Sequence, residues 1–454
     1  MLLPEDAIFK MGCGEFLWSH ALSSYTEQAF ACVSGRIANS MLNRMLHRNS
    51  DIDSIKLRTM TDMVEREGSK IIGDMREYGF RILKEHDWNP ETGLPEENAF
   101  IEPGIPAKDG NSFANSRSEE DERKYRKEID ALAESINQRL RQKGLKIPDN
   151  QALKYDIETD SSGGAVIVSL DGVGAKRQKD SRPPKDDREP FFQQDELDGP
   201  EDLKRAPDPK KRPKVETAVA HIEADGQKYM LAATNMFVLC EIVLAFLLEH
   251  GLLNGRKLLF LTDGGRDIRG AVETIFAFCP YTLMLDWFHL KKHCLELLSM
   301  CIIGGKKNFS IQYEIKRNLF RRLFAGDVDG AKQYLASLPD SHIKNKSILQ
   351  SLSDYLERRR DSIACYILRH EMGLRISSNP VEKANDMLVS RRQKGKGMSW
   401  SRNGSWGLAG ITAKYLNNES RNWNENHCMS FEMYPRYGSL FCANDDVAEL
   451  PKAA

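Results

Sequence analysis

The chain has 454 residues, of which 41% are hydrophobic and 29% charged, values that are typical of a globular protein of about three domains and exclude a disordered or fibrous one. Its formal net charge of −1 indicates no particular partner. No apolar run reaches the ~18 residues that a membrane span needs, and the first residues lack the pattern of a signal peptide. The nine cysteines include no C-x-x-C pair, which favours reduced thiols over disulfides or a zinc site, so we expect a cytoplasmic protein without membrane contacts.

The first part of the chain, residues 1–115, has few strand signals and is predicted to be mostly helical. Apolar residues recur at helical spacing over residues 38–46 (ANSMLNRML), and a polar break follows. A second helix is expected to begin near Asp53 or Ser54 and to end at Gly68, because glycine is common at helix C-termini. The sequence therefore predicts two short helices joined by a polar turn.

Such a helix pair is typical of the helix-turn-helix motif. The second helix of this motif enters the major groove of DNA, and here it would present Lys56 and Arg58. Plain packing of two helices gives the same pattern, so the sequence leaves both interpretations open.

A linker and a charged helix come next. Prolines and glycines accumulate over residues 89–115, which is typical of a loop. Residues 116–160 are predicted to form a solvated amphipathic helix, within residues 117–143, followed by a second linker. The helix is a candidate dimer contact. Its apolar residues at helical spacing are Ile129, Leu132, Ile136 and Leu140.

The clearest strand signal in the chain is the β-branched run at residues 165–170 (AVIVSL), which is expected to end at Asp171. Further along, residues 215–223 and 228–233 flank an Asp-Gly pair. That pair is the sequence signature of a β-hairpin. We therefore expect three antiparallel strands in succession.

The segment between the first strand and the hairpin, residues 176–214, is polar, charged and rich in proline. We expect it to be a disordered or exposed loop. It ends in PKKRPK, residues 209–214, which resembles a nuclear import signal and equally fits a basic loop beside nucleic acid or solvent.

A β-α-β unit follows an apolar helix expected at residues 236–250. The apolar run at residues 258–261 stops at Asp263, and after a helical segment a second apolar run, residues 281–285, stops at Asp286. Ligands gather at the carboxyl ends of parallel strands. The two aspartates therefore mark this edge of the predicted sheet as the place to look for a site.

Three antiparallel strands followed by parallel strands joined through helices is the topology of an RNase H-like fold. We therefore predict an α/β protein whose mixed five-stranded sheet, with flanking helices, is formed by residues 161–300 and completed by residues 373–425. A helical insertion would occupy residues 301–372, and residues 426–454 would form an irregular tail.

The insertion is expected to contain helices at residues 306–322, 330–338 and 348–370. The last of these would carry three arginines, residues 358–360, in its middle. After the insertion, a helix is expected to begin near Asn379, with Pro380 at its first position and Glu382 in its first turn. This helix leads into the basic run at residues 391–397.

Three acidic residues could act together. Asp171 and Asp263 follow strands that are neighbours in an RNase H-like sheet, and Glu382 lies on a helix that would pack across them. Carboxylates that converge from distant parts of a chain are the ligands that hard divalent cations prefer, and paired cations promote phosphoryl transfer. Taken singly, each aspartate is also ordinary turn chemistry and the glutamate is an ordinary first-turn residue.

These acidic positions, together with Asp286-x-x-His289, resemble the DDE transposases of bacterial insertion sequences, within the Mutator-like group. The group has an RNase H-like core, a helical insertion before the final glutamate and a C/D-x-x-H motif after the second aspartate. The most specific matches are LDWFHLKKH and VEKANDMLVSRRQKGKGMSWSRNG, and the resemblance covers roughly residues 163–416.

The resemblance implies a role for each of these residues. Asp171, Asp263 and Glu382 would be a catalytic triad that holds Mg²⁺ or Mn²⁺, with two ions expected, and Asp286 with His289 would shape the site or contact DNA. The partners would be element ends and target DNA, bound by a homodimer or a larger assembly.

Some assignments have alternatives. Asp267 lies in the same turn as Asp263, which we prefer because it directly ends the apolar run, and His289 is equally a buried histidine that bonds a carbonyl group. The basic run is expected either to bind DNA phosphates or to be a solvated face, with Met398 and Trp406 close by for base stacking. The expected DNA contacts after the final helix are Arg391, Arg392, Lys394, Lys396 and Trp400.

The sequence thus predicts a transposase that cleaves DNA strands and transfers them in a metal-dependent reaction. One alternative is a DNA-binding protein that derives from a transposase and has lost catalysis. Another is a different RNase H-like nuclease, such as a resolvase.

Overall fold

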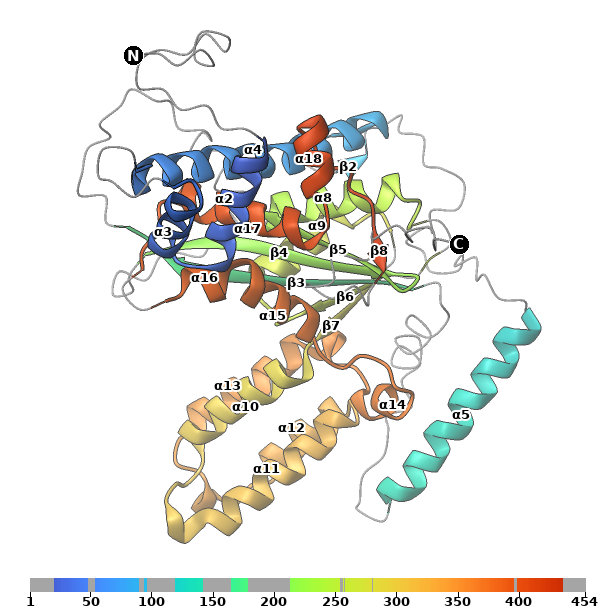
Figure 1. Ribbon diagram of the computed structural model, residues 1–454. Coiled ribbons are helices and arrows are strands. Elements are labelled where there is room, and N and C mark those ends of the chain that lie inside the picture. Colours follow the sequence, from blue (N-terminus) through green and yellow to red (C-terminus); the bar gives the residue numbers. More distant parts are fainter. Residues whose placement is uncertain are drawn as a thin grey trace, which may run out of the picture.

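The fold is mixed α/β, with a central sheet covered by helices on both faces (Figure 1). None of the described helices combines the length and the apolar character required to cross a lipid bilayer. The computed structural model describes residues 20–47, 54–89, 94–95, 119–141, 165–178, 213–253, 256, 258–279, 281–395 and 398–435. Residues 179–212 of the predicted loop at 176–214, residues 90–93 and 96–115 of the predicted linker at 89–115, and residues 436–454 of the predicted tail at 426–454 lie outside these residues. The described ends of the loop, Lys176 and Lys214, and Asn89 of the linker lie in strands instead.

Five strands form the main sheet, in the order β7-β6-β3-β4-β5, and the two-residue β8 (Tyr434–Pro435) extends the β5 edge. β3, β4 and β5 are antiparallel in succession, whereas β6 and β7 run parallel to β3. The prediction of a mixed five-stranded sheet is therefore confirmed. The strands are β3 (Val166–Lys176), β4 (Lys214–Ala224), β5 (Gln227–Ala233), β6 (Leu258–Thr262) and β7 (Thr282–Leu285).

The first strand is longer than its apolar run. The predicted end at Asp171 is wrong, because β3 continues to Lys176 with β4 paired to it along the way. Its parallel pairing with β6 stops earlier, at Leu170 opposite Thr262. Asp171 is therefore the first residue of β3 beyond the parallel part of the sheet, even though it lies in the middle of the strand.

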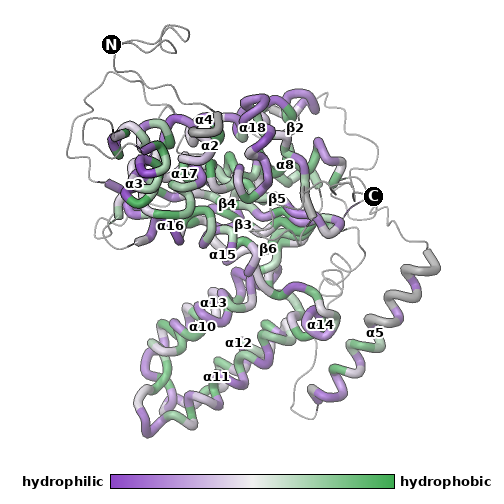
Figure 2. Tube along the Cα trace, in the orientation of Figure 1, coloured by the Kyte–Doolittle hydropathy of each residue, from purple (hydrophilic) through white to green (hydrophobic). Residues whose placement is uncertain are grey.

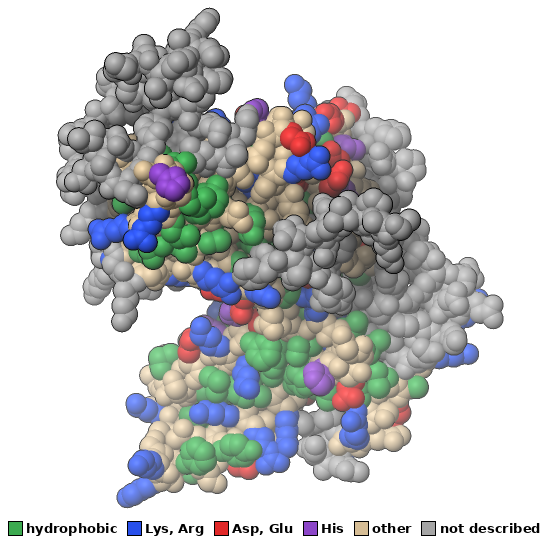
Figure 3. Space-filling view, viewed as in Figure 1, with side chains coloured by type: hydrophobic (Ala, Val, Ile, Leu, Met, Phe, Trp, Pro, Cys, Tyr) green, Lys and Arg blue, Asp and Glu red, His purple; other side chains and the backbone are tan. Residues whose placement is uncertain are grey.

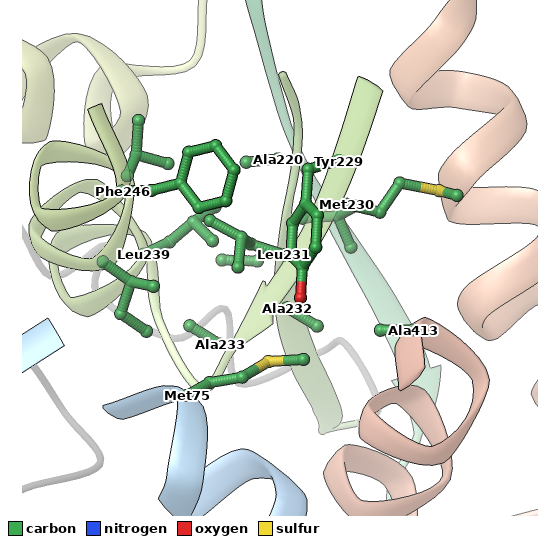
Figure 4. Close-up of a cluster of buried hydrophobic side chains, with 14 of the residues drawn as sticks. Met75, Ala220, Tyr229, Met230, Leu231, Ala232, Ala233, Leu239, Phe246 and Ala413 are labelled. Atoms are coloured by element: carbon green, nitrogen blue, oxygen red, sulfur yellow. The ribbon is translucent and has the colours of Figure 1, made fainter. Parts of the chain in front are cut away.

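Helices α8 (Met236–Glu249), α9 (Arg266–Ile275), α4 (Leu57–Glu85) and α17 (Arg402–Leu416) make up the layer on one face of the sheet. α8 is apolar all round, so it must be buried, and it packs between β4, β5, α4 and α9. Figure 4 shows Tyr229 of β5 beside Phe246 of α8, whose ring centroids are 4.9 Å apart. In Figure 2, apolar residues (green) and polar residues (purple) alternate along most of the outer helices.

Gly68 does not end a helix. The predicted second short helix is in fact α4, which runs through Gly68 to Glu85. A β-carbon at Gly68 would lie 2.4 Å from the backbone of Gly407 in α17, so glycine permits the two helices to touch backbone to backbone. The helix continues because this distant contact stabilises it, which a local cap signal cannot reveal.

The remaining N-terminal helices join the same core. α2 (His20–Cys32) and α3 (Gly35–Met45) pack against α4, and the predicted helix at 38–46 is α3. Lys414 of α17 and Glu27 of α2 form a buried ion pair. The N-terminal helices are thus part of the folded core. A further short pair of strands, Trp88–Asn89 and Leu94–Pro95, follows α4.

Beyond β7 the chain forms a helical lobe (Figure 1), whose hydrophobic core includes side chains of β6 and β7. Figure 3 shows Lys and Arg side chains spread over its exposed face. α5 (Glu119–Arg141) packs against it, with Ile136 buried beside Cys365 and Leu368. The lobe contains α10 (Trp287–Cys301), α11 (Phe309–Phe324), α12 (Val328–Ala336), α13 (Lys346–Arg358) and α14 (Tyr366–Glu371).

The predicted helix at 348–370, with three arginines in its middle, is wrong. Residues 358–360 mark the end of a helix instead. α13 stops at Arg358, and a 3₁₀ turn follows at Arg360–Ser362. Arg360 donates hydrogen bonds to both Asp329 and Glu357. These hydrogen bonds connect the end of α13 to α12 and stabilise the turn, so the helix does not continue.

Candidate functional site

Sheet register places three aspartates side by side. Leu170 pairs with Thr262, and Thr262 with Leu285, as the last parallel pairs of β3, β6 and β7. Asp171, Asp263 and Asp286 each occupy the next position on their strand. Neighbouring strands lie about 4.8 Å apart, so the three residues form a row across the carboxyl edge of the parallel strands. We refer to Asp171, Asp263, Asp286 and the nearby Glu382 as the acidic row.

Asp171 is the residue whose ionisation this arrangement affects most. Burial, and after it the negative charges of Asp263 and Glu382, raise its pKa, while the N–H of Gly172 and His289 lower it, and the net result is a pKa of about 6. Two donors still hold the carboxylate: the backbone N–H of Gly172 at 2.7 Å from Oδ1 and Nδ2 of Asn385 at 2.5 Å from Oδ2. Asp263, Glu382 and His289 are therefore within electrostatic range of Asp171. A cation bound among the carboxylates would relieve the repulsion between them.

The raised pKa of Asp171 has a consequence for stability. Because its pKa rises from 3.8 to about 6 on folding, the charged carboxylate destabilises the metal-free fold progressively between these values and fully above pH 6. Asp171→Asn is expected to increase the free energy of unfolding by about 1–2 kcal/mol at pH 8, allowing for solvent screening, and by less at pH 5. Asn385 can flip its amide to accept a hydrogen bond from the new side chain.

Urea unfolding with a chelator present, at pH 5 and pH 8, measures this effect. A loss of stability at pH 8, or an equal gain at both pH values, would contradict a pKa of Asp171 that burial and neighbouring charges raise.

A tight turn fixes Asp263. Its Oδ1 accepts a hydrogen bond from the backbone N–H of Gly265 at 2.7 Å. Gly264 has φ +84°, and a β-carbon there would lie 2.7 Å from Leu285, so this position requires glycine. Arg359 of the helical lobe donates to the carbonyl of Gly264 and so joins the lobe to the turn. The alternative candidate Asp267 lies on the exposed first turn of α9.

Glu382 lies on α15 (Asn379–Asn385), which begins as predicted, with proline in its first turn. α15 packs over β3 and β4. Oε1 of Glu382 is 3.6 Å from Nε2 of His289. The helix continues through a π-helical turn, η5 (Asp386–Ser390), into α16 (Arg391–Gln393). Local π turns are frequent at functional sites.

Asp286 and His289 connect β7 to the segment before α15. The fully buried carboxylate of Asp286 accepts hydrogen bonds from the backbone N–H of His289 at 2.7 Å and from that of Ser378 at 2.5 Å. Burial alone would raise the pKa of Asp286, but these bonds and His289 lower it. Asp286, 3.2 Å away, in turn raises the pKa of His289. In the described part of the chain the buried Nδ1 of His289 has no hydrogen-bond partner, and its Nε2 faces Glu382.

The acidic row has the chemistry of a divalent-cation site but is not a closed cage. In the described part of the chain, no three His, Cys, Asp or Glu side chains stand close enough together to hold an ion as they lie. Like charges repel, so each carboxylate takes its own local partner: Asn385 for Asp171, Gly265 for Asp263 and His289 for Glu382. Apart from the imidazole of His289, the side-chain donors of the acidic row are carboxylate oxygens, the type of ligand that Mg²⁺ or Mn²⁺ prefers.

The predicted DNA contacts near α16 divide into two groups. Arg391, although exposed, pairs with Asp386 at 2.8 Å, and Lys394 is exposed. Lys396 lies outside the described residues. Phosphate contacts by Arg391, Lys394 and Lys396 stay predictions.

For Arg392 the prediction is wrong, because its side chain is buried and donates to the carbonyl of Phe30 at 2.7 Å. Its guanidinium also covers the ring of Trp400, 5.3 Å from the centroid, and the indole N–H of Trp400 donates to Gln393. Trp406 is buried as well and donates to Glu216. These three residues hold the segment after α16 on the core. Trp400 is half-buried, and its contact with bases stays a prediction.

The N-terminal candidates are on the surface. Lys56 immediately precedes α4 and is exposed, and Arg58 is exposed beside Asp62 at a distance of 3.7 Å. α4 packs one side against α8 and α17, and exposed residues continue along its other side. DNA reading by this helix stays a prediction.

Two residues that hold the acidic row were missed from the sequence. Asn385 follows Glu382 by three residues on the same helix, a spacing that places both on one side and could have identified it. Arg359 had no comparable signal, because its partner Gly264 lies far away along the chain.

Comparisons with models of protein families, with curated proteins and with solved structures gave no match to this chain.

Proposed function

We propose that this chain is a DDE transposase, with an RNase H-like core, that cleaves and transfers DNA strands. The observation that carries the proposal is the convergence on one sheet edge of Asp171, Asp263 and Glu382, which repel one another electrostatically. The order of strands and the position of the helical lobe between β7 and α15 are those expected for such a core. The sequence motif Asp286-x-x-His289 supports the same family.

Each side chain has a distinct task in this proposal. Divalent cations, when bound, would activate the attacking oxygen and stabilise the leaving oxygen of the phosphodiester. Asp171, Asp263 and Glu382 would hold them, and Glu382 would exchange its contact with His289 for this role. Asp286 keeps the imidazole in place, so that His289 can then face the negatively charged substrate.

A second candidate function is DNA binding without catalysis. It is favoured by the absence, among the described residues, of a preformed group of three metal ligands. The two candidates differ in one assay: incubation of the protein with DNA that carries the sequences flanking its gene, in Mg²⁺ and in chelator. A transposase produces 3′-hydroxyl ends only with the metal. Binding without cleavage in either condition would favour the second candidate.

A further inference from the structure

The side-chain amide of Asn385 uses its nitrogen in a hydrogen bond, but its oxygen has no partner in the described part of the chain. Its residue surface is 6% exposed, and its Nδ2 donates to Oδ2 of Asp171 at 2.5 Å. In the described part of the chain, the buried Oδ1 of Asn385 has no hydrogen-bond partner. Leaving a buried amide oxygen unsatisfied is costly, so a position that keeps one is expected to receive a donor from a ligand.

The helix geometry directs this side chain at the acidic row. Asn385 is the last residue of α15, three residues after Glu382, and the π turn η5 begins at the next residue. Residues three apart on a helix are neighbours on its surface; Asn385 is buried against β3, and Glu382 lies beside it on the exposed side of α15, where it faces His289. The wider winding of η5 changes the direction of the side chains that follow, and in α16 the side chain of Gln393 forms hydrogen bonds with Ser405 of α17.

The type of side chain matters. A lysine or arginine at this position would also hold Asp171 but would neutralise it and compete with a cation. A carboxamide donates one hydrogen bond while it leaves the negative charge of Asp171 available. Its oxygen is, in addition, an acceptor of the kind that binds the water molecules around Mg²⁺.

We propose that Asn385 is a positioning residue of the cation site, whose Nδ2 orients the carboxylate of Asp171 and whose Oδ1 accepts a hydrogen bond from a water molecule that arrives with the cation. The inference rests on the proposed function, because it requires that the acidic row binds a divalent cation. It adds a neutral fourth residue to the three carboxylates and explains why a buried asparagine lies against Asp171.

The test is titration of the full-length protein with Mn²⁺ alone, followed by electron paramagnetic resonance of the free ion. Asn385→Leu keeps the size of the side chain and removes both hydrogen-bonding groups. It is expected to weaken Mn²⁺ binding about 10-fold, the value of one charge-assisted hydrogen bond. In the cleavage assay the same variant is expected to need about 10-fold more Mg²⁺ and then to reach the wild-type rate. Asn385→Ala serves as the second variant if Asn385→Leu does not fold.

Val381→Ala is the matched control, since Val381 is also fully buried on α15 but carries no polar atom. It is expected to lower thermal stability and to leave Mn²⁺ affinity unchanged. Wild-type Mn²⁺ affinity in Asn385→Leu, or an equal loss in Val381→Ala, would overturn the role of Asn385 and leave the proposed function standing. If the wild type binds Mn²⁺ no better than Asp263→Asn, the proposed function fails, and the inference fails with it.

Discussion

Asp171→Asn, Asp263→Asn and Glu382→Gln are each expected to lower the rate of Mg²⁺-dependent strand cleavage by about 10³-fold or more. Each substitution removes a charged ligand from a site where a cation contributes several kcal/mol at the transition state, and about 1.4 kcal/mol corresponds to a factor of ten. Single-turnover cleavage measures the rate, and fluorescence anisotropy in chelator checks that DNA binding is retained.

Asp267→Ala is the control for these variants. Asp267 is acidic and follows β6 closely, but it lies on the exposed first turn of α9 and not in the acidic row. The cleavage rate of the Asp267→Ala variant is expected to stay within about a factor of two of the wild-type rate, because an exposed residue outside the site is replaced. If Asp267→Ala abolished cleavage while Asp263→Asn did not, the second ligand would have to be reassigned to Asp267.

The second large effect is expected on stability. Asp286→Ala should reduce the free energy of unfolding by about 3 kcal/mol, because it leaves the backbone N–H groups of His289 and Ser378 without their buried acceptor. Asp286 also accepts from the hydroxyl of Ser378 at 3.2 Å. These bonds fix the start of α10 and the segment before α15, so the substitution should also loosen Glu382 and His289.

Urea unfolding at pH 7 measures the loss, with Asp340→Ala as the comparison. Asp340 pairs with Lys346, but both side chains are largely exposed, and such pairs contribute at most about 1 kcal/mol. A loss below about 1 kcal/mol for Asp286→Ala would show that the buried carboxylate does not hold these elements together.

Local sequence patterns predicted much of the fold. The apolar run before Asp263, the Asp-Gly pair of the hairpin and the proline after Asn379 each determine structure through their immediate neighbours. Because strand ends were recognisable, the positions of Asp263 and Asp286 at one sheet edge followed from topology. Asp171 was placed at the same edge even though its strand continues past it.

Contacts between distant segments account for what the sequence did not show. Gly68 continues a helix because of Gly407, and Arg392 is buried because the carbonyl of Phe30 accepts its hydrogen bond. Both residues carry the usual local signals of a helix cap and of a phosphate contact, and both signals were outweighed by tertiary packing. The role of Asn385 likewise depends on where β3 brings Asp171.

The most direct test of the account is a crystal structure of the protein grown with Mn²⁺, with anomalous diffraction recorded at the manganese absorption edge. The account predicts an anomalous peak in contact with the carboxylates of Asp171 and Asp263, with Glu382 turned from His289 toward the ion. Saturating Mn²⁺ that gives no peak at these carboxylates, or a peak only elsewhere on the chain, would contradict it.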